Sequence, residues 1–175
     1  MKIGLLSDTH GYLDPRIMNH FKDCDEVWHA GDVGDVSLLE ELERFKTVRG
    51  VYGNIDDRSI QSRFPKNCRF LCEGIDVWIT HIGGTPPRYN PEIKKLLNDH
   101  SPDLFICGHS HILRIQRDVN FNNMLYVNPG AAGNHGFHRT KTIVRFEING
   151  KKIEGMEVIE LGKRGVLVNT PDQKR

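Results

Sequence analysis

Several features that would assign a function outright are absent from this sequence of 175 residues. Its longest apolar runs have about five residues, far below the roughly twenty that span a bilayer, and the first run ends at Asp8. Lysine and arginine number 24 and aspartate and glutamate 23, so the net charge is only +1. Such a balance provides no bulk field for nucleic acid or an anionic membrane. We therefore expect a cytoplasmic protein that recognises any anion locally.

The four cysteines also lack a functional pattern. Cys68 and Cys72 are the one close pair, and no second pair matches them in the manner of a zinc finger. We interpret all four, including Cys24 and Cys107, as reduced, with Cys107 as a small core residue. These observations exclude a disulfide scaffold and a structural zinc site held by thiolates.

The length suits a single domain with a sizeable core and is too short for two. No internal repeat, low-complexity tract or linker divides the sequence. We predict one domain over residues 1–168 and a flexible tail at residues 169–175.

Apolar strands and amphipathic segments alternate in the first third of the chain. Strands are predicted at residues 2–7, 26–30 and 47–52, and helices at residues 14–21 and 37–45. Asp14 is the expected N-cap of the first helix, with Pro15 as its first residue. This alternation indicates a parallel sheet with right-handed crossovers.

The remainder is predicted to contain more strands and one further helix. An irregular surface connection is expected at residues 58–67 and a loop at 83–87, with a hairpin between them that turns at Glu73-Gly74. Asn90 and Pro91 open a helix that ends near Asp99. The last predicted strands cover residues 104–107, 112–117, 124–127, 142–148 and 151–160. We expect those after residue 112 to pair antiparallel, with Asn149-Gly150 as a hairpin turn.

Five apolar runs end in side chains that can bind a metal ion. These side chains belong to Asp8 and His10, Asp32, Asn54, His81, and His109 and His111. Because the carboxyl ends of parallel strands share one sheet edge, we expect the seven side chains to lie together. Within each of the pairs Asp8-x-His10 and His109-x-His111, extended backbone would direct both side chains the same way. A set of imidazole, carboxylate and amide ligands without thiolate favours manganese, iron or zinc.

Each of these residues has an ordinary interpretation when it is taken alone. Asp8, Asp32 and Asn54 are types that commonly cap helices or occupy turns, and a single histidine such as His81 is more often a satisfied core residue. Their joint occurrence at five strand ends favours the metal site. We place the other five histidines outside the metal shell, namely His20, His29, His100, His135 and His138. If one of these were an exception, it would be His135, because its loop would approach the site.

In order and spacing, these motifs resemble those of the calcineurin-like metallophosphoesterases, in particular the small prokaryotic phosphodiesterases. Asn128-Pro129-Gly130 resembles that branch too, so the similarity covers roughly residues 1–148. The resemblance implies an α/β (α+β) fold of the metallo-dependent phosphatase type, a two-sheet mixed β-sandwich flanked by helices, with a dinuclear metal centre. It implies one metal ion held by Asp8, His10, Asp32 and His111, and a second by Asp32, Asn54, His81 and His109. Asp32 would be the bridge.

Such a centre indicates a phosphoesterase by its charge. Two divalent cations outweigh the charges of Asp8, Asp32 and a bridging hydroxide, so the loaded centre attracts a phosphate anion. The metals would lower the pKa of the bridging water, and the hydroxide would attack phosphorus in line and cleave a P–O bond. We expect a phosphodiesterase of a small substrate with two divalent ions, manganese first and iron, zinc or nickel as alternatives. Its catalytic residues would be Asp32, Asn54 and His81, with Asn54 also contacting the phosphoryl group.

One position departs from the family pattern. In the larger family the Gly-Asn pair is followed by a histidine thought to assist the leaving group, and here that position is Ile55. Isoleucine cannot donate a proton. Asp56 or Asp57 could replace the histidine as proton donor if its pKa were raised. A solvated or supporting role is the commoner one for such residues. We therefore expect diesters or activated monoesters to be preferred over unactivated alkyl monoesters.

Two arginines are candidate substrate contacts by charge and position alone. Arg58 follows Asn54 closely and Arg88 follows His81, and an ordinary surface role is the alternative for both. A non-catalytic scaffold is a second functional class, because the resemblance includes a retromer subunit that uses this fold to bind proteins. The presence of all seven ligand residues favours the enzyme. A nuclease is disfavoured by the charge balance, and the C-terminal hairpin offers an edge for a homo-oligomer.

Overall fold

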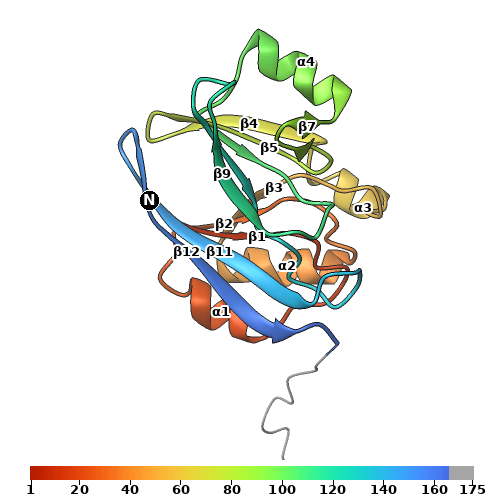
Figure 1. Cartoon of the computed structure of the whole chain (residues 1–175). Coiled ribbons are helices and arrows are strands. Elements are labelled where there is room, and N and C mark those ends of the chain that lie inside the picture. The colour runs from red at the N-terminus through yellow and green to blue at the C-terminus, as the bar shows by residue number, and fades with distance from the viewer. Residues whose placement is uncertain (166–175) are drawn as a thin grey trace, which may run out of the picture.

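The computed structural model describes residues 1–165, in which ten of the strands form two sheets of five (Figure 1). The first sheet consists, in spatial order, of β12 (Lys152–Lys163), β11 (Thr140–Asn149), β1 (Lys2–Leu6), β2 (Glu26–His29) and β3 (Thr47–Gly50). The second consists of β4 (Asn67–Cys72), β5 (Ile75–Thr80), β8 (Leu104–Ile106), β10 (Met124–Asn128) and β9 (Arg114–Asp118). The predicted tail at residues 169–175 and the predicted domain boundary at 168 lie outside the described residues.

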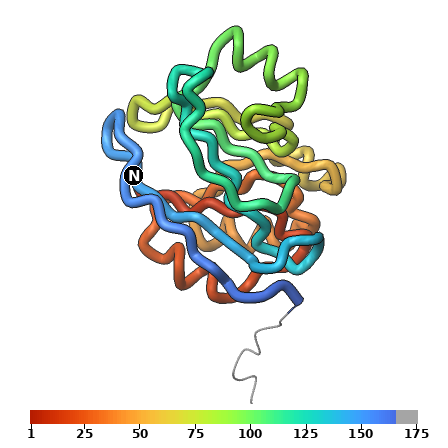
Figure 2. The backbone as a smooth tube through the Cα atoms, viewed as in Figure 1, coloured from red at the N-terminus to blue at the C-terminus, as the bar shows by residue number. Residues whose placement is uncertain are grey.

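Helices cover the outer faces of this sandwich. The helices are α1 (Arg16–Phe21), α2 (Val36–Phe45), α3 (Arg58–Gln61) and α4 (Pro91–Asp99). Figures 1 and 2 show α1 and α2 on the side of the first sheet and α4 beyond the second. No helix among the described residues is long or apolar enough to cross a bilayer. The predicted two-sheet mixed sandwich flanked by helices is confirmed.

Both sheets combine parallel and antiparallel pairs. In the first, β1, β2 and β3 are parallel, whereas β11 pairs antiparallel with β1 and β12. In the second, β5, β8 and β10 are parallel, whereas β4 and β9 pair antiparallel at its two edges. The parallel sheet predicted for the first third of the chain is confirmed by β1, β2 and β3. The assumption that all five strand ends share one sheet edge is wrong, since the parallel strands are divided between two sheets.

Strand β1 shows why its sequence is apolar almost throughout. Ile3 and Leu5 face the interior between the two sheets, where they pack with residues of the second sheet such as Val77. Leu6 faces the opposite way, toward Ile17 of α1. Both faces of the strand are buried, as expected for a strand covered on two sides. Each such aliphatic side chain contributes about 1.5–3 kcal/mol through its burial.

Two connections differ from the sequence-based expectation. Helix α1 itself starts as predicted, because Asp14 Oδ1 accepts the N–H of Arg16 over 3.1 Å and Pro15 has helical backbone angles, so that Asp14 caps the helix. Residues 58–67 are not simply irregular, because Asp57 caps the short helix α3 and β4 already begins at Asn67. The segment predicted as a loop at 83–87 contributes to a small hairpin of β6 (Gly84–Thr85) and β7 (Arg88–Tyr89).

Asp14 also forms a buried ion pair. Lys141 of β11 and Asp14 are both fully buried, and the Lys141 Nζ lies 3.0 Å from Asp14 Oδ2. Arg16 also donates to this carboxylate, with its Nη2 2.7 Å from Oδ2. Burial alone would raise the pKa of Asp14, but the hydrogen bonds from Arg16 and Lys141 outweigh it and lower the pKa to about 2. The ion pair connects the start of α1 to β11 of the first sheet.

Replacing Lys141 by methionine should lower the free energy of unfolding by about 3 kcal/mol, because Asp14 then keeps only the partly exposed Arg16 as its cation. Urea denaturation at neutral pH measures this change. The double variant Asp14→Asn/Lys141→Met carries no lone buried charge and should recover most of the loss.

Acid titration provides the control. A carboxyl group with a lowered pKa stabilises the folded state above its unfolded pKa of about 4, and this contribution is lost as the pH falls toward 2. The wild type should therefore lose roughly 2 kcal/mol more stability over this interval than the double variant. If Lys141→Met and Asp14→Asn/Lys141→Met lost the same free energy of unfolding at neutral pH, the ion pair would not be important for stability.

Candidate metal centre

The strand ends of both sheets converge at one end of the sandwich. Backbone hydrogen bonds join the loops that follow them: Asp8 donates its N–H to Gly31 over 3.0 Å, and His10 donates to Asp32 over 3.0 Å. Gly108 donates to the carbonyl of His81 over 3.1 Å in the second sheet. The five predicted strand ends therefore do meet, although they come from two sheets.

The backbone at these strand ends is not extended. Five of the predicted ligand residues have left-handed φ angles, namely Asp8 (54°), His10 (49°), Asp32 (54°), His109 (66°) and His111 (58°). This conformation is uncommon for residues other than glycine and costs of the order of 1 kcal/mol or more at each position. The expectation that extended backbone aims each pair is therefore wrong. The chain instead turns at these five ligand residues, where the surrounding structure has to hold an unfavourable backbone conformation.

One group of side chains consists of Asp8, His10, Asp32 and His111, whose ligand atoms all lie within 4.8 Å of one another. The Nε2 atoms of His10 and His111 are 3.3 Å apart. His111 Nε2 lies 3.1 Å from Asp8 Oδ1, and His10 Nε2 lies 3.6 Å from Asp32 Oδ2. This is the spacing of atoms that surround one cation.

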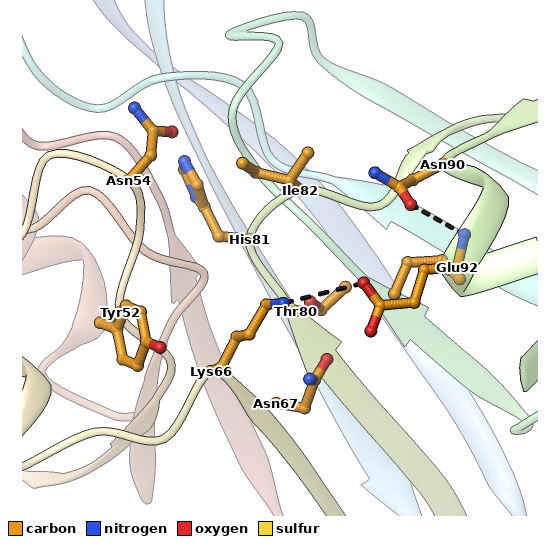
Figure 3. Close-up of a pocket in the computed structure, with 10 residues that line it drawn as sticks. Tyr52, Asn54, Lys66, Asn67, Thr80, His81, Ile82, Asn90 and Glu92 are labelled. Carbon is orange, nitrogen blue, oxygen red and sulfur yellow. Dashed lines mark hydrogen bonds and ion pairs between the residues drawn. The ribbon is translucent and has the colours of Figure 1, made fainter.

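A second group consists of Asp32, His81 and His109, again within 4.8 Å. His81 Nε2 lies 3.2 Å from Asp32 Oδ1, so the two oxygens of Asp32 face different groups. His109 and His111 are two residues apart but belong to different groups. Asn54 lies beside His81 at the border of a cavity described below (Figure 3).

Two buried atoms of these groups lack any hydrogen-bond partner. They are Asp8 Oδ1 and His81 Nε2, and each is directed at its own group. Such atoms are rarely left unpaired in a protein interior because the loss of solvation is costly. A metal ion next to each would supply the missing partner, so the residues present fit a metal in both groups.

The charge of Asp32 and the neutral ring of His10 suit metal binding. Burial would raise the pKa of Asp32, but the nearby His81 ring and the N–H of Ile55 outweigh it, so the pKa is lowered and the carboxylate stays ionised. Burial lowers the pKa of His10 and thereby favours the neutral imidazole. His81 donates from Nδ1 to the carbonyl of Ala30 over 2.8 Å, which leaves Nε2 as the atom that can bind a metal.

Residues that the sequence did not indicate support this arrangement. His29 accepts the N–H of Gly31 at Nδ1 over 3.1 Å, and its Nε2 then donates to Thr9 Oγ1 over 3.0 Å. Burial lowers the pKa of His29 to about 4, so it stays neutral. Ser7 Oγ donates to Asp8 Oδ2 over 2.6 Å. Ser7 and Thr9 flank the predicted ligand Asp8 in the sequence, and this was the only signal that could have indicated their supporting role.

Asp56 braces the loops on the other side. Its Oδ1 accepts the N–H of Gly34 and its Oδ2 accepts that of Gly53, both over 2.7 Å. Asp57 accepts the N–H groups of Ser59 and Ile60 at the start of α3. Both carboxylates act as acceptors for backbone donors, so the supporting role is the one that the geometry favours over a proton donor for the leaving group.

Two glycines are required by close approach. A Cβ at Gly53 would overlap the Asp32 carboxylate, and a Cβ at Gly108 would overlap the Ser7 hydroxyl. The backbone therefore has to pass directly beside the groups that form the centre.

Two further histidines lie against the first group. The ring centroids of His135 and His10 are 4.9 Å apart, and those of His138 and His111 are 5.3 Å apart. The loop of His135 thus approaches the site as expected, and that of His138 does so as well. Neither is a member of the two groups, nor are His20, His29 and His100.

A cavity of about 240 Å³ opens next to the second group, with Asn54 and His81 on its border (Figure 3). Arg58 and Arg88 are exposed and do not line it. Their role in substrate binding stays a prediction.

The sequence model of the calcineurin-like phosphoesterase superfamily domain matches residues 1–151. The chain belongs to this superfamily. A probable metallophosphoesterase of Methanothermobacter thermautotrophicus is 28% identical over 167 residues, which cover 93% of this chain and 94% of that protein. The family is metal-dependent, so the two groups of side chains stand where this calcineurin-like phosphoesterase would be expected to hold metal.

Solved structures share the fold. The structure of an archaeal phosphodiesterase has a TM-score of 0.71 and 22% identity, and covers 91% of this chain and 100% of that one. Vps29 from Entamoeba histolytica in complex with Zn²⁺ also has a TM-score of 0.71, with 15% identity over 91% of this chain and 99% of that one. At these identities the likeness extends to the fold alone.

Replacing Asp56 by asparagine should weaken metal binding by about 10–100-fold, because an amide NH₂ would face one of the two glycine N–H donors and displace the loops that carry the ligands. Isothermal titration with Mn²⁺ measures the affinity.

Asp57→Ala is the matched control. Loss of the α3 cap should cost about 1 kcal/mol of stability and leave the Mn²⁺ affinity unchanged. An Asp56→Asn protein that bound Mn²⁺ as tightly as the wild type would exclude the bracing role.

Proposed function

We propose that this calcineurin-like phosphoesterase is a phosphodiesterase of small substrates that works with two divalent metal ions. The observation that carries the proposal is the pair of side-chain groups that share Asp32, one oxygen facing each group. The unpartnered Asp8 Oδ1 and His81 Nε2, one in each group, support occupancy of both positions.

The metals, when bound, would lower the pKa of a water molecule and polarise the phosphoryl oxygens. Asp8, His10, Asp32 and His111 would hold one ion, and Asp32, Asn54, His81 and His109 the other. Manganese is our first choice because nitrogen and oxygen ligands without thiolate suit it, and iron, zinc and nickel are alternatives.

The protein's own side chains would orient the phosphate. Asn54 has an amide whose oxygen can face the metal while its NH₂ donates to a phosphoryl oxygen. His81 is held by its hydrogen bond to Ala30, so its ring keeps one orientation throughout. Asp32 would hold the two metal positions at a constant separation.

The neighbourhood of Ile55 favours good leaving groups. Ile55 follows Asn54, is 46% exposed and cannot donate a proton. Asp56 and Asp57 are occupied by backbone donors. A leaving group that needs no protonation, such as an aryloxide or another stabilised alkoxide, is therefore preferred. This supports diesters and activated monoesters over alkyl monoesters.

A non-catalytic scaffold is the second candidate, because Vps29 shares the fold. The completeness of the ligand set favours the enzyme, since all seven predicted ligand residues are present and six of them form the two groups. An archaeal phosphodiesterase with this fold supports the same choice.

Asp32→Asn should impair both metal binding and hydrolysis, because both would depend on the shared carboxylate. We expect the bound Mn²⁺ to fall from about two ions per chain to one or fewer, and hydrolysis of bis(4-nitrophenyl) phosphate to fall at least about a hundredfold. Elemental analysis and a spectrophotometric assay measure these changes.

The matched control is Asp35→Asn, which replaces the exposed N-cap of α2 by another good cap and should leave both values unchanged. A wild-type protein that binds less than one transition metal per chain and takes up none from added Mn²⁺ would instead support the scaffold.

Ile55→His should restore the missing proton donor. Wild-type protein loaded with Mn²⁺ should hydrolyse bis(4-nitrophenyl) phosphate faster than glycerol phosphate, and the variant should gain about tenfold or more on glycerol phosphate alone. The pH profiles of kcat for the two substrates measure the gain.

Ile55→Gln serves as the control, since glutamine is polar but cannot act as an acid in this range. A wild-type enzyme that cleaved alkyl monoesters faster than activated diesters would refute the preference.

A further inference from the structure

The cavity of about 240 Å³ is built by four separate segments that meet beside the second metal position. Tyr52 and Asn54 come from the loop after β3, and Asn67 starts β4. Thr80 to Ile82 follow from the end of β5, and Ile93 belongs to α4. Figure 3 shows His81 and Asn54 at one end of this space.

The depth of the cavity follows from the exposure of its lining. Thr80 and His81 are each only 3% exposed and form its inner part. The Lys66 and Glu92 side chains are 66% and 72% exposed and mark its outer end. A phosphate bound next to His81 would therefore direct one ester substituent along the cavity and away from the metal centre.

The walls between these ends are largely apolar. Ile82 is 41% exposed and Ile93 only 5% exposed, and the half-buried Tyr52 lies opposite. Asn67 accepts the indole N–H of Trp78 at Oδ1 over 3.3 Å, which leaves its amide NH₂ as a donor for a ligand. Apolar walls with a few fixed polar groups are the usual composition of a small-molecule site.

The charges of the lining cancel. Lys66 Nζ lies 3.8 Å from Glu92 Oε2, and Figure 3 shows the two side chains directed at each other in front of Thr80. One cation and one anion leave no net charge for a charged ligand group to neutralise. A second phosphate or a carboxylate on the substituent would therefore gain nothing from this cavity.

The size limits the ligand further. At about 240 Å³ the cavity is smaller than the 300–1,000 Å³ clefts that hold drug-sized molecules, so it accommodates one ring rather than several. We propose that this cavity is the subsite for one ester substituent of the substrate, and that this substituent is uncharged and of the size of a single ring. The inference rests on the proposed function, because it assumes that the phosphate binds at the metal centre.

Three phosphonates, which cannot be hydrolysed as esters, separate the two sites. They are methylphosphonate, phenylphosphonate and 4-carboxyphenylphosphonate, titrated calorimetrically into the full chain loaded with Mn²⁺. Methylphosphonate reports on the phosphate position alone. Phenylphosphonate should bind at least about tenfold more tightly because its ring enters the apolar cavity, and the carboxyl derivative should lose most of this advantage.

Ile82→Trp fills the cavity from its exposed wall. In this variant the advantage of phenylphosphonate over methylphosphonate should disappear, while methylphosphonate should bind as in the wild type. Asn67→Phe fills it from an exposed position on another segment and serves if the first variant does not fold.

Ile112→Trp is the matched control. Ile112 is 66% exposed and follows a predicted ligand, His111, as Ile82 follows His81, but it does not line the cavity. Its variant should keep the full advantage of phenylphosphonate.

Glu92→Gln tests the charge argument. Removal of the carboxylate leaves Lys66 unneutralised, so the affinity for 4-carboxyphenylphosphonate should rise a few-fold relative to phenylphosphonate.

The outcomes distinguish the two proposals. If no phosphonate binds the protein loaded with Mn²⁺, the proposed function fails. If methylphosphonate and phenylphosphonate bind equally well, or if Ile82→Trp and Ile112→Trp reduce the phenyl advantage alike, only the cavity subsite is overturned.

Discussion

The buried carboxylate of Asp32 is the contact on which the rest of the centre depends. Its Oδ1 faces His81, which follows a strand of the second sheet, and its Oδ2 faces His10, which follows a strand of the first. Asp32 itself follows β2 and is only 2% exposed. An ionised carboxylate at this depth is costly unless cations or donors surround it. The N–H of Ile55 supplies one donor over 3.2 Å, and metal ions would supply the positive charge.

The surrounding loops hold ligands in conformations that the chain would not adopt by itself. Left-handed backbone at five ligand positions is unfavourable, and it persists because hydrogen bonds from outside the groups over-determine it. Ser7 holds Asp8, His29 links the loops of Thr9 and Gly31, and Asp56 links those of Gly34 and Gly53. These hydrogen bonds connect neighbouring loops to one another and support the ligand residues from outside the two groups.

The two groups of candidate metal ligands differ in their surroundings. His135 and His138 lie against the first group, so that side is covered by imidazole rings. The second group adjoins the cavity of about 240 Å³ and offers space for an organic substituent. Under the proposed function, this asymmetry would give the substrate one direction in which to lie, with its phosphate at metals held by the shared carboxylate and its substituent in the cavity beside His81. Ile55, which has no proton to give, follows Asn54 at the border of this cavity.

The sequence alone determined which residue types occupy the strand ends, because short apolar runs followed by Asp, Asn and His can be recognised from local pattern. Local signals also placed the Asn149-Gly150 turn and the Asn90 cap of α4 correctly. The family resemblance added the two-sheet sandwich and the separation of His109 from His111. Only the tertiary structure decided which strand pairs with which and that the chain turns, rather than runs extended, at five of the ligand residues. It likewise decided that Asp56 links the loops of Gly34 and Gly53 and that four segments enclose a cavity beside His81. The physical reason is that periodicity records which face of an element is buried, whereas strand pairing, backbone handedness at a strand end and cavity shape arise from contacts between residues far apart in the chain.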